Sequence, residues 1–205
     1  MKVGIDFDNT LVSYDDIFLR AAIERKLLPE HFTGDKTEVR DSIRSLVGDE
    51  QWAKLQAEVY GRRMAEATMI EGASDFVAAC RANNATVSIV SHKTRFAAAD
   101  PGGADLHEVA ILWMERNRFF SKDGLRLERD DVFFEPTRKA KCRRIAALEC
   151  SHFVDDLEEV FREPDFPSGV ERLLLYRGQN KLPAGPFTVF ADWDAITEAV
   201  FSRGR

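Results

Sequence analysis

Long apolar runs, paired cysteines and an excess of basic residues are all missing from this chain. No apolar stretch approaches the roughly 20 residues that a membrane-spanning helix needs, so no membrane partner is expected. The net charge of −6 disfavours broad binding to nucleic acid. The three cysteines, odd in number and without metal-type spacing, indicate reduced thiols. Because no charged-then-apolar leader precedes the first apolar run, we expect a cytoplasmic protein.

The composition is that of a soluble globular protein, since 44% of the 205 residues are apolar and 31% are charged. The length allows one domain, with or without an inserted module. From residue 14 to residue 70, apolar residues recur at helical spacing, as Val39, Ile43 and Val47 do. This periodicity predicts a run of helices with no strand among them.

From residue 71 onward, short β-branched or aromatic runs alternate with helical patterns of ten or more residues. One of these helices is expected to open at Pro136. The alternation predicts an α/β fold with a Rossmann-like, mostly parallel sheet and helices on both faces. Its core would comprise residues 1–13 and 71–205, and the all-helical stretch 14–70 would be inserted between the first and second strands.

The chain begins with a short apolar run, formed by Val3, Ile5 and Phe7, that suits a buried strand. Asp6 and Asp8 lie at the end of this run. In open α/β sheets, ligands bind at the carboxyl ends of the strands. Two carboxylates held so close repel each other unless a cation lies between them or one is protonated. Both arrangements are useful to phosphoryl transfer.

Polar groups also follow two later predicted strands. One strand ends at Ser91, and another ends at Asp155 and Asp156. Lys139 and Lys141 lie in the helix just before that last strand. Taken singly, each of these residues is typical of a turn, a helix cap or a solvated helix face. Because the carboxyl ends of parallel strands meet at one edge of a sheet, we expect them to converge into one site.

The order of these groups resembles a known family. The chain carries Asp6-Phe-Asp8-Asn-Thr10, then Val87-Ser-Ile-Val-Ser91, then a lysine, then Phe153-Val-Asp155-Asp156. This series is similar to the four motifs of the haloacid dehalogenase (HAD) superfamily. The resemblance covers roughly residues 1–13 and 71–200, and it places residues 14–70 where that family has a helical type 1 cap. Asp8 implies the phosphatase branch rather than the dehalogenase branch.

The resemblance implies Mg²⁺-dependent hydrolysis of a small phosphorylated metabolite. Asp6 would be the nucleophile, giving an aspartyl-phosphate. Asp8 would protonate the leaving alkoxide and later deprotonate the attacking water. Ser91 would donate to a phosphoryl oxygen. Lys141 would offset the crowded charge, because Ile145 and Leu148 follow it at the spacing that the family's helix tends to show, and Lys139 is the alternative.

The implied metal site draws on the same residues. Mg²⁺ prefers oxygen ligands. It would be held by Asp6, the main-chain carbonyl of Asp8, and Asp155, with Asp156 as a second acidic group beside it.

Other functions stay open as alternatives. A phosphomutase, a phosphonatase or a non-catalytic binding module could share the same fold. A receiver-type phosphoacceptor domain uses similar groups in a different order, and a glycosyltransferase with an Asp-x-Asp site would need a nucleotide-binding loop that is not evident here. The basic residues of the helical stretch could contact an anionic substrate or be solvated helix faces. They are Arg20, Arg25, Lys26, Arg40, Arg44, Arg62 and Arg63.

Overall fold

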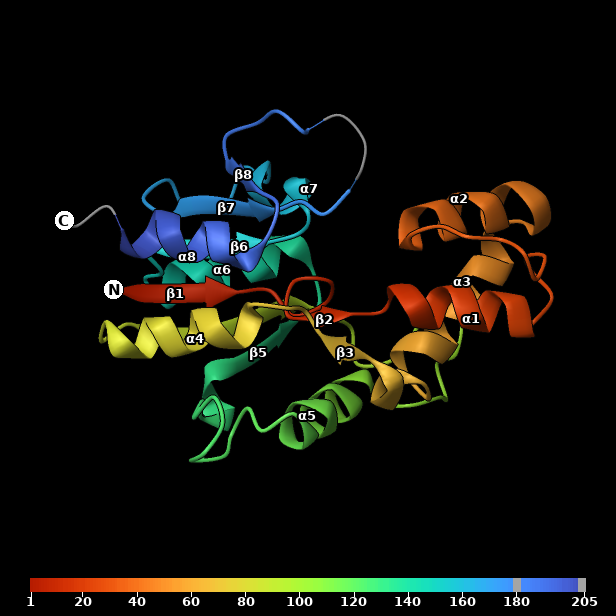
Figure 1. Cartoon of the computed structure of the whole chain (residues 1–205), viewed down its shortest axis with the longest axis horizontal. Coiled ribbons are helices and arrows are strands. Elements are labelled where there is room, and N and C mark those ends of the chain that lie inside the picture. The colour runs from red at the N-terminus through yellow and green to blue at the C-terminus, as the bar shows by residue number, and fades with distance from the viewer. Residues whose placement is uncertain (179–181, 203–205) are drawn as a thin grey trace. The chain divides into compact units, whose positions relative to one another are not determined.

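The chain forms two compact units in the computed structural model, which describes residues 1–178 and 182–202 (Figure 1). The first unit comprises Met1–Val12, Met69–Lys93 and Asn117–Arg205, and the second comprises Ser13–Thr68 and Thr94–Arg116. Most of the stretch expected to be an inserted helical domain therefore lies in the second unit, together with a later segment.

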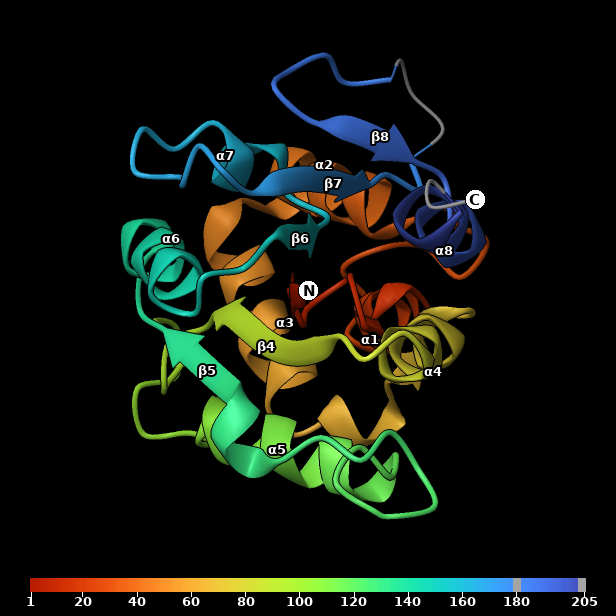
Figure 2. The same cartoon turned by 90° about the vertical axis from the view of Figure 1, so that its left-hand side faces the viewer.

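The first unit is built on a six-stranded parallel sheet with the order β5-β4-β1-β6-β7-β8 (Figure 2). The strands are β1 (Lys2–Ile5), β4 (Thr86–His92), β5 (Val132–Glu135), β6 (His152–Asp155), β7 (Glu171–Leu175) and β8 (Thr188–Phe190). The predicted parallel, Rossmann-like sheet is confirmed. Its central strand β1 has β4 on one side and β6 on the other, so the three strands that carry the polar ends are neighbours.

Close packing beside β1 requires a residue without a side chain. A Cβ atom on Gly4 would come within 2.5 Å of the ring of Phe153 on β6. Such an approach is far closer than carbon atoms tolerate, so a glycine at this position lets the ring lie against the strand. This contact helps to hold β1 and β6 in register.

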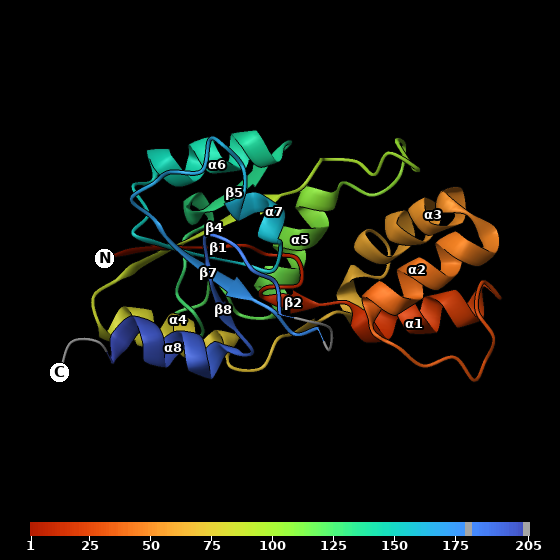
Figure 3. The same cartoon turned by 90° about the horizontal axis from the view of Figure 1, so that it is seen from above.

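Helices cover both faces of the sheet, as predicted (Figure 3). On one face lie α4 (Ala73–Ala82) and α8 (Trp193–Phe201), joined by Phe76 and Trp193 with ring centroids 4.9 Å apart. On the other lies α6 (Arg138–Ala147), which shares an apolar cluster with α7 (Glu158–Phe161).

The helix expected to open at Pro136 begins two residues later, at Arg138. The Thr137 hydroxyl accepts a hydrogen bond from the Ala140 N–H at 3.1 Å and so caps α6. A side chain that satisfies a free N–H group sets this boundary, whereas Pro136 cannot provide such a cap.

The second unit is helical, with α1 (Asp15–Glu24), α2 (Lys36–Val47), α3 (Asp49–Tyr60), the short η1 (Met64–Glu66) and α5 (Leu106–Arg116). Phe18 of α1 stacks on Trp52 of α3, with ring centroids 4.9 Å apart. Trp113 of α5 donates its indole N–H to the carbonyl of Ala67 at 2.8 Å. These contacts tie α1 to α3, and α5 to the chain that follows η1.

The expectation that residues 14–70 contain no strand is wrong. Val12–Ser13 (β2) and Thr68–Met69 (β3) form a two-stranded sheet. Strands of two residues are too short to show the alternation by which a strand is detected in a sequence.

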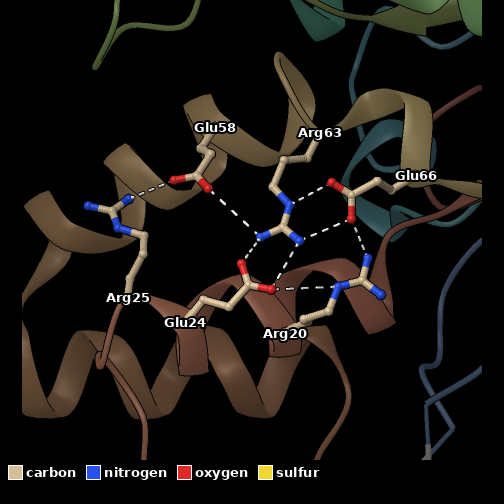
Figure 4. Close-up of polar contacts among 6 residues, drawn as sticks. All are labelled: Arg20, Glu24, Arg25, Glu58, Arg63 and Glu66. Carbon is tan, nitrogen blue, oxygen red and sulfur yellow. Dashed lines mark hydrogen bonds and ion pairs between the residues drawn. The ribbon is translucent and has the colours of Figure 1, made fainter.

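Six charged side chains form an arginine–glutamate cluster on the second unit (Figure 4). Arg63 is its centre, with Nη1 2.6 Å from Glu24 and Nε 2.8 Å from Glu66. Hydrogen bonding to Glu66, and then to Glu24, raises the pKa of Arg63 against the effect of burial. The other members are Arg20, Arg25 and Glu58. Six of the seven basic residues considered for substrate contact thus have carboxylate partners within their own unit, three of them in this cluster.

The three cysteines are free and buried. Burial raises the pKa of Cys80 to about 12. Burial likewise raises the pKa values of Cys142 and Cys150 to about 11. These thiols stay protonated and pack as small apolar side chains. Among the described residues, no helix has the length and apolar character needed to cross a membrane.

Candidate active site

The carboxyl ends of three adjacent strands supply the polar groups of the first unit. Asp6 directly follows β1, and its N–H donates to the carbonyl of Val154 on β6 at 2.9 Å. Ser91 is the penultimate residue of β4, and Asp155 is the last residue of β6. The parallel sheet therefore brings residues that are far apart in the sequence to one edge.

Three carboxylates meet at this edge. Asp6, Asp155 and Asp156 each present an oxygen atom within 4.8 Å of the others. Asp6 is 5% exposed and Asp155 is completely buried. The side chain of Asp8 is outside this group. A set of carboxylate oxygens with no nitrogen or sulfur suits a hard divalent cation such as Mg²⁺, which would also relieve their mutual repulsion.

One lysine lies among these carboxylates. The Lys141 ammonium is 2.5 Å from Asp6 Oδ1 and 2.6 Å from Asp155 Oδ2, and its side chain is only 1% exposed. Lys139, by contrast, is on the outer side of α6, where its side chain is 58% exposed and lies 3.3 Å from Asp165. Of the two candidate lysines, the fold brings Lys141 to the site.

The charges of this cluster shift the titration of its members. Burial raises the pKa of Asp6 well above its ordinary value, Lys141 opposes this, and the carboxylates of Asp155, Asp156 and Asp8 raise it further. Burial alone would lower the pKa of Lys141, but Asp155 and Asp6 outweigh that effect, so its pKa is raised. Lys141 therefore stays positively charged, and a further cation near Asp6 would favour its ionised form.

A buried hydroxyl group points to an additional ligand. Ser91 is 1% exposed, and its Oγ has no hydrogen-bond partner among the residues that the structure describes. Leaving a buried hydroxyl unpaired costs about 1–3 kcal/mol. A ligand oxygen that accepts a hydrogen bond from Ser91 would remove this cost.

A second buried lysine contacts Asp8, and sequence reasoning missed it. Lys93 Nζ lies 2.8 Å from Oδ2 and 3.0 Å from Oδ1 of Asp8. The available signal was strand alternation: because side chains two positions apart share one side of a strand, Lys93 continues the side of Ser91. The structure places it so, with Ser91 and Lys93 buried and His92 exposed between them.

A cavity of about 470 Å³ adjoins the outer side of the carboxylate group. Asp156 lines it, together with Glu158 and Arg162 of the α7 region and Tyr176 after β7. Asp156 is therefore the member of the group that borders open space, whereas Asp6 and Asp155 are enclosed.

Comparison with solved structures shows that the chain has the fold of haloacid dehalogenase-like hydrolases. The chain is similar to a HAD family hydrolase from Deinococcus radiodurans, solved with bound phosphate and sodium, at 17% identity and TM-score 0.59 over 99% of this chain and 96% of that one. It is similar to a haloacid dehalogenase-like family hydrolase from Streptococcus pneumoniae at 12% identity and TM-score 0.58, over 100% and 98% of the two chains.

A third similar structure has a different activity in its name. It is a β-phosphoglucomutase from the archaeon Pyrococcus sp. strain ST 04, at 13% identity and TM-score 0.53 over 98% of this chain and 99% of that one. A scan against protein-family models finds no match, and neither does a search of curated proteins. The similarities establish the fold, and the reaction has to be argued from the site.

Proposed function

We propose that this protein is a cytoplasmic, Mg²⁺-dependent phosphatase that hydrolyses a small phosphorylated metabolite through an aspartyl-phosphate. The observation that carries the proposal is the cluster at the strand ends, in which a buried lysine lies between Asp6 and Asp155. The unpaired hydroxyl of Ser91 supports it, because a phosphoryl oxygen is a suitable acceptor. The bound phosphate of the Deinococcus structure agrees with such a ligand.

The first step forms and breaks one bond to phosphorus. An Asp6 oxygen attacks the phosphorus atom, the bond from phosphorus to the leaving oxygen breaks, and the Asp8 carboxyl gives its proton to that oxygen. Ser91 donates to a non-bridging phosphoryl oxygen, and Lys141 holds the nucleophile while offsetting its charge. A Mg²⁺ ion held by Asp6, the Asp8 carbonyl, Asp155 and Asp156 would supply further neutralisation of the phosphoryl charge.

The second step regenerates the enzyme. A water oxygen bonds to phosphorus, the bond from phosphorus to Asp6 breaks, and Asp8 takes a proton from that water. Inorganic phosphate and the free alcohol are the products. Asp8 thus carries one proton out to the leaving group and one back from water, so it has to be held beside both.

The test is an assay of a generic aryl phosphate with Mg²⁺ and with a chelator. We expect turnover that requires the metal and falls to background in Asp6→Asn, which keeps the side-chain shape but removes the nucleophile. Circular dichroism would verify that the variant is folded. Metal-independent turnover, or full activity in Asp6→Asn, would refute the mechanism.

A phosphomutase is the second candidate, because the fold matches that of a β-phosphoglucomutase over 98% of this chain. The two activities differ in the acceptor of the phosphoryl group. Incubation with phosphorylated sugars and analysis of the products separates them: release of inorganic phosphate supports the phosphatase, whereas isomeric sugar phosphates without phosphate release support the mutase.

A further inference from the structure

Lys93 is held rigidly at the end of β4. Its N–H donates to the carbonyl of Glu135 on β5 at 3.0 Å, which extends the pairing of the two strands by one residue. Its side chain is 4% exposed, and Nζ lies 5.9 Å from the centre of the Phe7 ring. Because both the backbone and the side chain are fixed, the ammonium group has a defined position.

Asp8 lies just beyond the end of β1, in a turn. In this turn the Leu11 N–H donates to the Phe7 carbonyl at 3.0 Å, Asn9 has a positive φ of 60°, and Asp8 itself pairs with Val12 in an isolated bridge. The Lys93 ammonium group contacts both carboxylate oxygens of Asp8, at 2.8 and 3.0 Å, and so holds this side chain in one direction.

Lys141 and Lys93 thus divide the acidic groups between them. Lys141 contacts Asp6 and Asp155, whereas Lys93 contacts Asp8. Lys141, the lysine predicted from the sequence, contacts Asp6, the nucleophile of the proposed mechanism. Lys93 contacts Asp8, which gives and takes protons in that mechanism. Ser91 and Lys93 are two positions apart and both buried, with the exposed His92 between them, so strand alternation predicts that they share one side of the strand end.

We propose that Lys93 is a positioning residue that orients the Asp8 carboxyl toward the leaving oxygen of the substrate. The inference rests on the proposed phosphatase function. Loss of Lys93 should then slow a substrate in proportion to its need for a proton on the leaving group. Acid catalysis is worth about 10²- to 10⁴-fold where it is needed, and it matters little for a leaving group that is stable as an anion.

The experiment compares two substrates of nearly equal size, 4-nitrophenyl phosphate and phenyl phosphate, with Mg²⁺ present. The nitrophenolate leaves readily without a proton, whereas the phenolate is a poorer leaving group. In Lys93→Met, we expect kcat/KM to fall about tenfold or more further for phenyl phosphate than for 4-nitrophenyl phosphate. This ratio does not depend on how much of the variant is folded, because unfolded protein lowers both rates by the same factor.

Two further variants complete the test. Lys2→Met removes a lysine whose partner, Glu149, is at 2.6 Å but exposed, and it should keep the wild-type ratio. Lys93→Gln should show the same selective loss as Lys93→Met, and it carries the test should Lys93→Met give no folded protein.

The outcomes distinguish this inference from the function on which it rests. Equal losses for both substrates, or a raised KM alone, would make Lys93 a structural or phosphate-binding residue and overturn the inference, while the phosphatase would stand. A wild-type enzyme that hydrolyses neither substrate would overturn the proposed function, and the role of Lys93 with it.

Discussion

Both units contain a cluster of interleaved acidic and basic side chains, but water reaches the two clusters very differently. In the first unit, the side chains of Lys141 and Asp155 are 1% and 0% exposed. In the arginine–glutamate cluster of the second unit, Arg20 and Glu24 are 51% and 54% exposed (Figure 4). Exposed ion pairs stabilise a protein by at most about 1 kcal/mol, whereas burying charges costs more than their attraction readily returns.

The difference in burial shows which cluster is a burden on the stability of the fold. Apolar side chains in place of a buried ion cluster are often neutral or stabilising. The strand ends nevertheless hold Asp6, Asp8 and Asp155 against two lysines, together with a hydroxyl that lacks a partner among the described residues. Groups that burden stability in this way are typical of a site arranged for a ligand. In the arginine–glutamate cluster the charges are balanced and every member has a partner, so ordinary surface ion pairing accounts for it.

The largest expected effect is the loss of Lys141. Lys141→Met leaves Asp6 and Asp155 buried without their shared cation, so we expect a loss of about 3–5 kcal/mol in the free energy of unfolding. The rate should also fall about 10²- to 10³-fold, as for other charge-stabilising groups in active sites. Urea denaturation and steady-state kinetics measure the two effects.

Lys139→Met is the matched control, because Lys139 lies on the same helix with an exposed partner. It should change stability by less than about 1 kcal/mol and leave the rate nearly unchanged. A larger loss of rate in Lys139→Met than in Lys141→Met would reassign the role of the lysine.

The raised pKa of Asp6 predicts how pH acts on the buried cluster. The unfolded chain ionises Asp6 near its ordinary pKa, but the folded chain does so only at higher pH. Between these values the folded chain binds more protons than the unfolded chain, so the free energy of unfolding should fall as pH rises through this range. In chelator, Asp6→Asn should remove this contribution to the pH dependence.

A bound divalent cation should counteract this pH-dependent fall in the free energy of unfolding. At a concentration 100-fold above its dissociation constant, a bound ion stabilises the folded chain by about 2.7 kcal/mol. Thermal unfolding at neutral pH, with Mg²⁺ and with chelator, measures this, and Asp155→Asn should reduce the response. An equal response in wild type and variant would place the cation elsewhere.

The sheet and its polar edge could be predicted because local patterns specify them. The run Val87–Val90 is short and rich in β-branched residues, and the helices between strands have clear periodicity. This alternation predicts a mostly parallel sheet. The choice between Lys139 and Lys141 stayed open in the sequence, where only the resemblance to the family's helix favoured Lys141. The structure buries Lys141 and leaves Lys139 exposed.

What the sequence could not indicate depends on contacts between distant segments. Lys93 lies 85 positions from Asp8, so no local pattern shows that the two side chains meet. Nothing local assigns residues 94–116 to the second unit, because that depends on pairs such as Trp113 with Ala67. The two-residue strands β2 and β3 carry no periodic signal at all.

The smallest expected effect is in the arginine–glutamate cluster. Arg63 is its most enclosed member, with a side chain 13% exposed, but its partners Glu24 and Glu66 are 54% and 39% exposed. We expect Arg63→Met to lower the free energy of unfolding by about 1 kcal/mol, and high salt to remove most of the difference, since water and ions screen these carboxylates. Chemical denaturation by urea at low and at high salt measures both. A salt-independent loss as large as that of Lys141→Met would mean that the second unit also depends on a desolvated charge, and the contrast between the two clusters would fail.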